Sequence, residues 1–182
     1  MGISVIKKKP WDIRDLVIVG LIAALARALG LISVFALGGM NPISLTVRAM
    51  IVAILYIVLL HKVRRFGALT LAILIGALTS FLIMAIGIVT LPILLLGGLA
   101  AESFISLAGR ERTISIVAGV FLMTLVERAA GLFVVYLNMR ESVGMIWPFL
   151  IMSVPGLCGT ALGCFYAPLF IKELKRACFI NG

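Results

Sequence analysis

Residues Ala68–Ala108, ALTLAILIGALTSFLIMAIGIVTLPILLLGGLAAESFISLA, form an apolar run in which Glu102 is the one charged residue. As a continuous helix these 41 residues would extend about 61 Å, roughly twice the thickness of the hydrocarbon core of a bilayer. The stretch therefore predicts two membrane-spanning helices joined by one turn. We expect the turn at residues 87–92, where glycine and proline interrupt the apolar run.

The rest of the chain has the same apolar character. Of its 182 residues, 63% are hydrophobic and 13% charged, against roughly 45–50% and about 25% in soluble domains. This composition excludes a water-soluble globule and predicts an all-α integral membrane protein, with residues 1–182 forming a single transmembrane domain. Six stretches supply the roughly 20 apolar residues that a membrane-spanning helix needs: Leu16–Leu37, Ile43–Leu60, Ala68–Val89, Leu91–Ala108, Thr113–Leu137 and Val143–Ile171. In the last stretch, Pro155 predicts a kink and Pro168 an early end.

Basic residues predict the orientation of the chain. Twelve of the sixteen Lys and Arg residues flank the stretches on one side, within residues 7–14, 62–65, 110–112 and 172–176. Because Lys and Arg gather in cytoplasmic loops, both termini are expected in the cytoplasm, with the helices crossing the cytoplasmic (inner) membrane. The same rule accounts for the net charge of +9 without a nucleic-acid partner.

The sequence carries no recognisable set of catalytic groups. Its three cysteines form no CxxC pair, and no paired-histidine, nucleophilic-serine or P-loop motif occurs. We therefore expect no enzyme activity, no metal and no cofactor, so any coupling to ATP hydrolysis would come from partner subunits. The single histidine, His61, follows an apolar stretch beside Lys62, where a solvated position at the membrane interface is expected.

Ionisable residues inside the spans are costly in hydrocarbon and usually face a cavity or a partner. In this chain they are Arg27, Arg48, Glu102, Glu127 and Arg128. A rise of about 1.5 Å per residue places all of them except Glu102 in the outer half of the bilayer. The same rise places Glu102 near the midplane and closer to the cytoplasm. A pocket lined by three arginines and a glutamate, and open to the outside, would suit a ligand with a carboxylate or a phosphate.

The same charges also allow a purely structural interpretation. Arg27 or Arg128 could pair with Glu127 to hold helices together, and Arg48 could extend to the outer headgroups. Three arginines exceed what two glutamates can neutralise, and this surplus favours the ligand site.

Two polar or aromatic residues fall near the same outer mouth. Asn41 could add hydrogen bonds to a ligand, and Trp147 could stack on it. Both are candidate binding residues, although a position in the interfacial aromatic belt is favoured for Trp147.

Small residues at every fourth position allow helices to approach closely in lipid. Two such sets occur, one in the first stretch and one in the last: Gly20, Ala24 and Ala28, and Gly159, Gly163 and Ala167. Packing within the chain is favoured for both sets. If the first set instead faces lipid, it marks a docking surface for another membrane protein.

Two short segments carry a resemblance to a known family. They are Asp15–Leu25, DLVIVGLIAAL, and His61–Thr70, HKVRRFGALT. With six short helices, both termini cytoplasmic and polar groups near the outer side, the chain resembles the substrate-binding S components of energy-coupling factor (ECF) transporters. Within that family it looks most like the branch whose substrates are unassigned.

The resemblance implies a vitamin or related micronutrient as ligand, bound near the outer face. It implies delivery with a transmembrane coupling subunit and two ATPase subunits, and contacts of Ala24 and Ala28, extended by Gly20, with that coupling subunit. Ligand contacts vary across the family, so the four charged candidates depend on their depth alone. The charged pocket is a departure, because many sites in the family are largely aromatic and neutral.

Two other functions remain open from the sequence. A self-contained secondary transporter would use Glu102 and Glu127 as a proton relay, and the small size and the lack of a detectable inverted repeat stand against it. An assembly subunit of a larger membrane complex would bind no small molecule.

Overall fold

The computed structural model describes residues 11–39, 41–84, 91–138 and 146–176, and every regular element in these ranges is an α-helix. Six helices follow one another along the described chain: α1 (Ile13–Ala36), α2 (Pro42–Lys62), α3 (Ala68–Met84), α4 (Leu91–Ala108), α5 (Thr113–Asn138) and α6 (Ile146–Arg176). The predicted all-α class is confirmed. The bounds of α4 agree with those expected from the sequence, and those of α1, α2 and α5 and the end of α6 differ by one to five residues. The expected end of α3 and the expected start of α6 lie outside the described residues.

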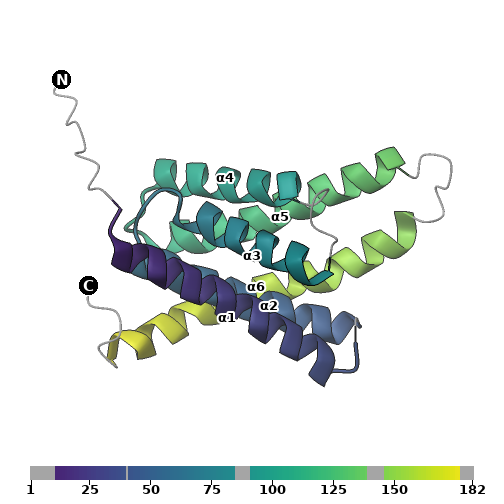
Figure 1. Ribbon diagram of the computed structural model, residues 1–182, viewed down its shortest axis with the longest axis horizontal. Coiled ribbons are helices and arrows are strands. Elements are labelled where there is room, and N and C mark those ends of the chain that lie inside the picture. The colour runs from purple at the N-terminus through teal and green to yellow at the C-terminus, as the bar shows by residue number, and fades with distance from the viewer. Residues whose placement is uncertain (1–10, 40, 85–90, 139–145, 177–182) are drawn as a thin grey trace.

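Successive helices run in alternating directions along an elongated bundle (Figure 1). The start of α1 and the end of α6 lie at the same end of the bundle as the α2–α3 and α4–α5 connections, and the α1–α2 connection lies at the opposite end. We call the first of these the basic end, since residues 14, 62–65, 110–112 and 172–176 bring most of the described Lys and Arg residues to it. That the basic end faces the cytoplasm stays a prediction from those residues.

The second helix forms the centre of the bundle. It packs against α6 and α1 over most of its length, and also contacts α5 and α3. Its residues 56–61 are all buried, with Ile57 and Leu59 fully enclosed. Leu69 and Ile73 of α3 and Ile116 of α5 complete this core.

Five of the six described helices are long and apolar enough to cross a membrane. The exception is α3, whose apolar part in the described residues is the shorter segment Ala68–Thr79. The sequence predicts that this helix continues to Val89, but residues 85–90, which hold most of the expected turn, lie outside the described residues. A sixth membrane crossing by α3 therefore remains a prediction.

The last helix continues through both of its internal prolines, Pro155 and Pro168, and ends at Arg176. The expected early end at Ile171 is wrong. The residues that follow Ile171 are Lys, Glu, Leu, Lys and Arg, which are strong helix formers. One turn apart within them, Arg176 Nη1 donates to Glu173 Oε1 at 2.9 Å, so the polar tail continues the helix beyond the apolar segment.

The small residues of α6 pack against α2, as expected from their spacing. A Cβ atom added to Gly163 would lie 2.7 Å from the Met50 carbonyl oxygen, and one added to Gly159 would overlap the backbone of Thr46. Ala167, one turn further on, is fully buried. These residues let the two helix backbones approach closely within the chain.

Glu102 lies at the basic end, where it stabilises the start of α3. Its carboxylate is 1% exposed and accepts hydrogen bonds from the backbone N–H groups of Gly67 (2.8 Å), Leu69 (2.7 Å) and Thr70 (3.2 Å), and from the Thr70 hydroxyl (3.0 Å). The first N–H groups of a helix lack partners within it, and a carboxylate there also interacts favourably with the helix dipole. The expected depth of Glu102, near the midplane and closer to the cytoplasm, stays a prediction, and α4 places this residue beside the α2–α3 connection.

His61 is buried, and the expected solvated position is wrong. Only 6% of the residue is exposed, and its Nδ1 and Nε2 atoms lie 3.0 Å from the Ile57 carbonyl oxygen and 3.3 Å from the Thr113 hydroxyl. The buried ring thus joins the end of α2 to the start of α5.

The segments Asp15–Leu25 and His61–Thr70, which carry the resemblance to S components, contact each other at the basic end. Arg65, from the second segment, forms an ion pair with Asp15, from the first, with 2.7 Å between Nε and Oδ2. The same guanidinium group lies over the ring of Trp11, 5.9 Å from its centre. These contacts hold the start of α1 against the α2–α3 connection.

Candidate functional site

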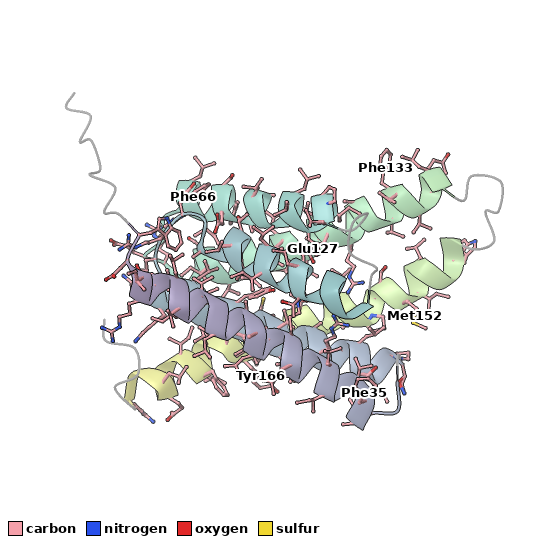
Figure 2. All side chains as sticks on the ribbon, in the orientation of Figure 1. Phe35, Phe66, Glu127, Phe133, Met152 and Tyr166 are labelled. Atoms are coloured by element: carbon pink, nitrogen blue, oxygen red, sulfur yellow. The ribbon has the colours of Figure 1, made fainter. Side chains whose placement is uncertain are left out.

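A cavity of about 320 Å³ lies between the helices, and all six helices contribute to its walls. Four charged side chains line it: Arg27 of α1, Arg48 of α2, and Glu127 and Arg128 of α5. Most of the remaining wall is apolar, from residues such as Val52, Ile73, Leu94 and Met123. Figure 2 shows Glu127 among the helices near the middle of the bundle. The predicted grouping of these four charges around one space agrees with this geometry.

Arg27 extends from α1 toward α3, where a glycine makes room for its head group. A Cβ atom added to Gly76 would lie 2.5 Å from Arg27 Nε, 2.9 Å from Nη2 and 3.1 Å from Cζ. Any side chain at position 76 would therefore occupy the space of the guanidinium group. The guanidinium group of Arg27 lies against the backbone of α3, inside the bundle.

Arg128 has the same relation to α6. A Cβ atom on Gly156 would overlap Arg128 Nη2 and lie 2.9 Å from Cζ. As with Arg27, the guanidinium group fills the place of a missing side chain. Two of the three arginines thus have their charged ends held against glycine backbones of neighbouring helices.

The other two charged residues also lie against glycines. A Cβ atom on Gly97 of α4 would lie 2.7 Å from Cγ of Glu127, and one on Gly30 of α1 would lie 3.4 Å from both Cγ and Nε of Arg48. The Gly30 contact shows that Arg48 packs along α1 within the bundle, and that contact does not favour an extended side chain reaching the headgroups.

The four charges are close together without forming direct pairs. Arg48 interacts electrostatically with Arg27 and Arg128, and Glu127 interacts with Arg128 and Arg27. Among the residues that the structure describes, none of the four side chains takes part in an ion pair or a side-chain hydrogen bond. Oε1 of Glu127 is buried without a hydrogen-bond partner. This arrangement lacks the Arg–Glu contact that a purely structural role would require.

Asn41 and Trp147 do not line the cavity. Asn41 precedes α2 in the α1–α2 connection, where its side-chain Nδ2 donates to the Leu37 carbonyl at 2.8 Å and its backbone N–H donates to the Ser44 hydroxyl at 3.0 Å. Trp147, in the first turn of α6, is 66% exposed. The structure thus places Asn41 in a turn and Trp147 on the outer surface, and it brings neither beside the four charges.

Tyr56 is a cavity residue that the sequence analysis missed. It is 4% exposed and follows Arg48 by eight residues, two turns further along the same face of α2. Its spacing from Arg48 was the available signal. The glycines at 76, 97 and 156 carried no such signal, because their importance depends on which helices are neighbours.

Glu102 and Glu127 lie in different surroundings. Glu127 lines the cavity, whereas Glu102 caps α3 at the basic end with both oxygens engaged. A proton relay needs groups that can exchange protons with a shared water-filled path. The capping role of Glu102 does not favour such a relay.

The small residues of α1 face outward. Ala24 and Ala28 are exposed, and a Cβ atom on Gly20 would meet no atom within 4 Å. The opposite face of α1, with Val19, Ala23 and Gly30, is buried against the bundle. Packing within the chain, which the sequence favoured for this set, is therefore not what the structure has, and the outward face is free for lipid or for another membrane protein.

The chain belongs to a bacterial family of integral membrane proteins. Residues 13–143 match the family described as "Hypothetical bacterial integral membrane protein (Trep_Strep)", which makes this chain a bacterial integral membrane protein. A comparison with curated proteins finds no match.

The fold is that of an S component. A solved structure titled "Crystal structure of an S-component of ECF transporter" superimposes with a TM-score of 0.63 and 18% sequence identity, and the match covers 95% of this chain and 90% of that one. The S-component-like architecture that the sequence segments suggested is confirmed. At this identity the likeness establishes the fold and leaves the ligand open.

Proposed function

We propose that this protein is the substrate-capture subunit of an ECF-type importer. It binds a small solute in the cavity lined by Arg27, Arg48, Glu127 and Arg128 and delivers it with an ATP-driven energy-coupling module. The observation that carries the proposal is a cavity inside an S-component fold with four charged side chains that form no ion pair with any described residue. Unpaired charges in hydrocarbon are costly, and they are typical of binding sites in membrane proteins.

The position of the cavity supports capture from outside the cell. Arg27 lies nearer the end of α1 than its start, and Arg48 follows the start of α2 by six residues, so both are closer to the α1–α2 connection than to the basic end. With the basic end in the cytoplasm, the site lies in the outer half of the membrane. A cavity of about 320 Å³ is at the small end of the range for ligand pockets and suits a vitamin or a related micronutrient.

The outward face of α1 supports the partner proposal. Gly20, Ala24 and Ala28 leave a shallow strip on which another transmembrane helix can pack closely. In this proposal the coupling subunit binds that strip, the two ATPase subunits hydrolyse ATP, and the chain itself is not an enzyme.

The experiment that tests the proposal is to identify the bound solute. The protein is purified in mild detergent from cells grown in rich medium, then denatured, and the released small molecules are analysed by mass spectrometry beside a mock preparation. We expect one vitamin-like compound in stoichiometric amount. No enriched compound from any of several media of defined, differing vitamin content would contradict the proposal and favour an assembly subunit.

Reconstitution separates the proposal from a self-contained carrier. The released compound is supplied to liposomes that hold either the chain alone under an ion gradient, or the chain with its coupling module and internal ATP. We expect uptake only in liposomes that hold the chain with its coupling module and ATP. Gradient-driven uptake by the chain alone would contradict the proposed function.

A further inference from the structure

The charges that line the cavity do not balance. Three guanidinium groups face one carboxylate, which leaves two positive charges unneutralised when all four groups are ionised. No other charged residue of the described chain lines the cavity. Uncompensated charges in a low-dielectric interior destabilise the folded protein, and a bound anion would neutralise the excess positive charge of this cavity.

The three arginines converge on the cavity from three helices. Arg27, Arg48 and Arg128 come from α1, α2 and α5, and Arg48 interacts electrostatically with each of the other two. Contacts with Gly76 and Gly156 hold two of the guanidinium groups inside the bundle. Like charges this close repel one another unless an anion lies between them, and the guanidinium fork binds carboxylate and phosphate oxygens with two parallel hydrogen bonds.

Glu127 requires a hydrogen-bond donor from the ligand, whereas the arginines require an anion. Its Oε1 atom is buried and has no hydrogen-bond partner. A buried carboxylate oxygen in this state needs a donor, because a buried acceptor without a hydrogen bond destabilises the folded protein. No described side chain supplies one, which leaves that role to the ligand.

We infer that the ligand is a small dianion, with its two negative charges on a phosphate or on two carboxylates, that also presents a hydrogen-bond donor to Glu127. The inference rests on the proposed function and specifies the substrate class of the same cavity. The arginines bind the anionic oxygens, while Glu127 weakens the binding of dianions that lack a donor. The wall from Val52, Ile73 and Leu94 encloses the apolar part of the ligand.

The test uses two simple dianions as probes, inorganic phosphate and succinate. The thermal unfolding midpoint of the purified protein is measured against probe concentration at about pH 8, above the second pKa of phosphate, with ionic strength held constant by chloride. Acetate serves as the monoanion control. We expect a saturable rise in the midpoint with phosphate, succinate or both, and none with acetate. Phosphate alone would identify a phosphorylated ligand, and succinate alone a dicarboxylate.

Single-residue variants test which charges attract the anion and which repel it. Arg48→Gln and Arg128→Gln are expected to weaken the binding of the responding probe at least about tenfold, because each removes a charge that contacts the anion. Glu127→Gln should instead tighten succinate severalfold, since succinate has no donor at this pH and is repelled by the carboxylate. Arg112→Gln, at an exposed arginine of the α4–α5 connection, is the matched control and should bind like the wild type.

Three results would overturn the inference. They are the absence of a saturable effect of both dianions on the wild type, an equal effect of acetate, and weaker succinate binding by Glu127→Gln. The Glu127 variant decides the matter even if the arginine variants do not fold. Failure here is distinct from failure of the proposed function: a neutral or cationic solute released from the purified protein would end the dianion inference and leave the capture subunit intact. Dianion binding without ATP-dependent uptake would support the dianion inference and end the proposed function as an importer subunit.

Discussion

A glycine on a neighbouring helix faces each charged side chain of the cavity. The effect is largest for Arg27 and Arg128, whose guanidinium groups occupy the space that a side chain at Gly76 or Gly156 would take. The missing side chain of a glycine on one helix thus leaves space for a charged side chain from the neighbouring helix. We therefore regard these glycines as positioning residues, which act on the ligand through the arginines.

This relation predicts that Gly156→Ala weakens ligand binding. The new methyl group would overlap Nη2 of Arg128 and displace its head group, and we expect a loss of affinity of about tenfold or more. Binding of the released solute to the purified variant is measured by calorimetry. Gly20→Ala makes the same chemical change on α1, where no atom lies within 4 Å, and should bind normally. Equal affinity in both variants would mean that Arg128 does not contact the ligand.

Glu102 is predicted to act on stability and not on binding. In Glu102→Gln a neutral amide replaces a carboxylate that accepts four hydrogen bonds, so the free energy of unfolding should fall by about 1–3 kcal/mol. Thermal unfolding and ligand titration are compared with those of Glu173→Gln, an exposed glutamate whose ion pair contributes little. Loss of solute binding at unchanged stability would contradict the capping role.

Helices were the part of the structure that the sequence predicted best. The run Ala68–Ala108 had to form two helices, and α4 begins and ends where the apolar pattern does. The end of α6 was missed because a helix that leaves the membrane can continue on polar residues, which the apolar pattern does not follow. The sequence also could not show which way each set of small residues faces. The sets that contain Gly20 and Gly163 have the same spacing and differ only in their neighbours.

The outward strip on α1 predicts a docking phenotype. Ala24→Leu places a bulky side chain on the exposed face, so it should abolish association with the coupling subunit in a co-purification assay and leave solute affinity unchanged. Ala23→Leu, one residue earlier on the buried face, should instead lower the unfolding midpoint through overpacking. Normal association of Ala24→Leu would assign the strip to lipid.

Charge depth predicted which residues share the cavity, and tertiary packing decided the rest. Ionisable side chains in apolar helices must avoid lipid, so Arg27, Arg48, Glu127 and Arg128 had to turn toward one interior space. Asn41 and Trp147 were selected by proximity to the outer mouth, a criterion that does not distinguish a turn or a surface position from a binding wall. Tyr56 was missed for the converse reason, since a buried tyrosine in an apolar helix resembles any core residue.

The orientation of the bundle in the membrane gives a further prediction. In a background with its cysteines replaced, Arg112→Cys should react with a membrane-impermeant maleimide only from the cytoplasmic side, because Lys and Arg gather there. Ile43→Cys, at an exposed position in the first turn of α2, should react only from outside. Labelling of both positions from the same side would contradict the up-and-down crossing of the membrane, and exchanged sides would place the cavity toward the cytoplasm.

We propose that four charges inside an S-component fold form the binding site of a captured solute. The most direct measurement is calorimetric titration of the solute released from the purified protein into wild type, Arg48→Gln and Arg112→Gln. We predict one molecule bound per chain of wild type and of Arg112→Gln, and binding weakened at least about tenfold in Arg48→Gln. Equal affinity of all three proteins would show that the cavity is not where the solute binds.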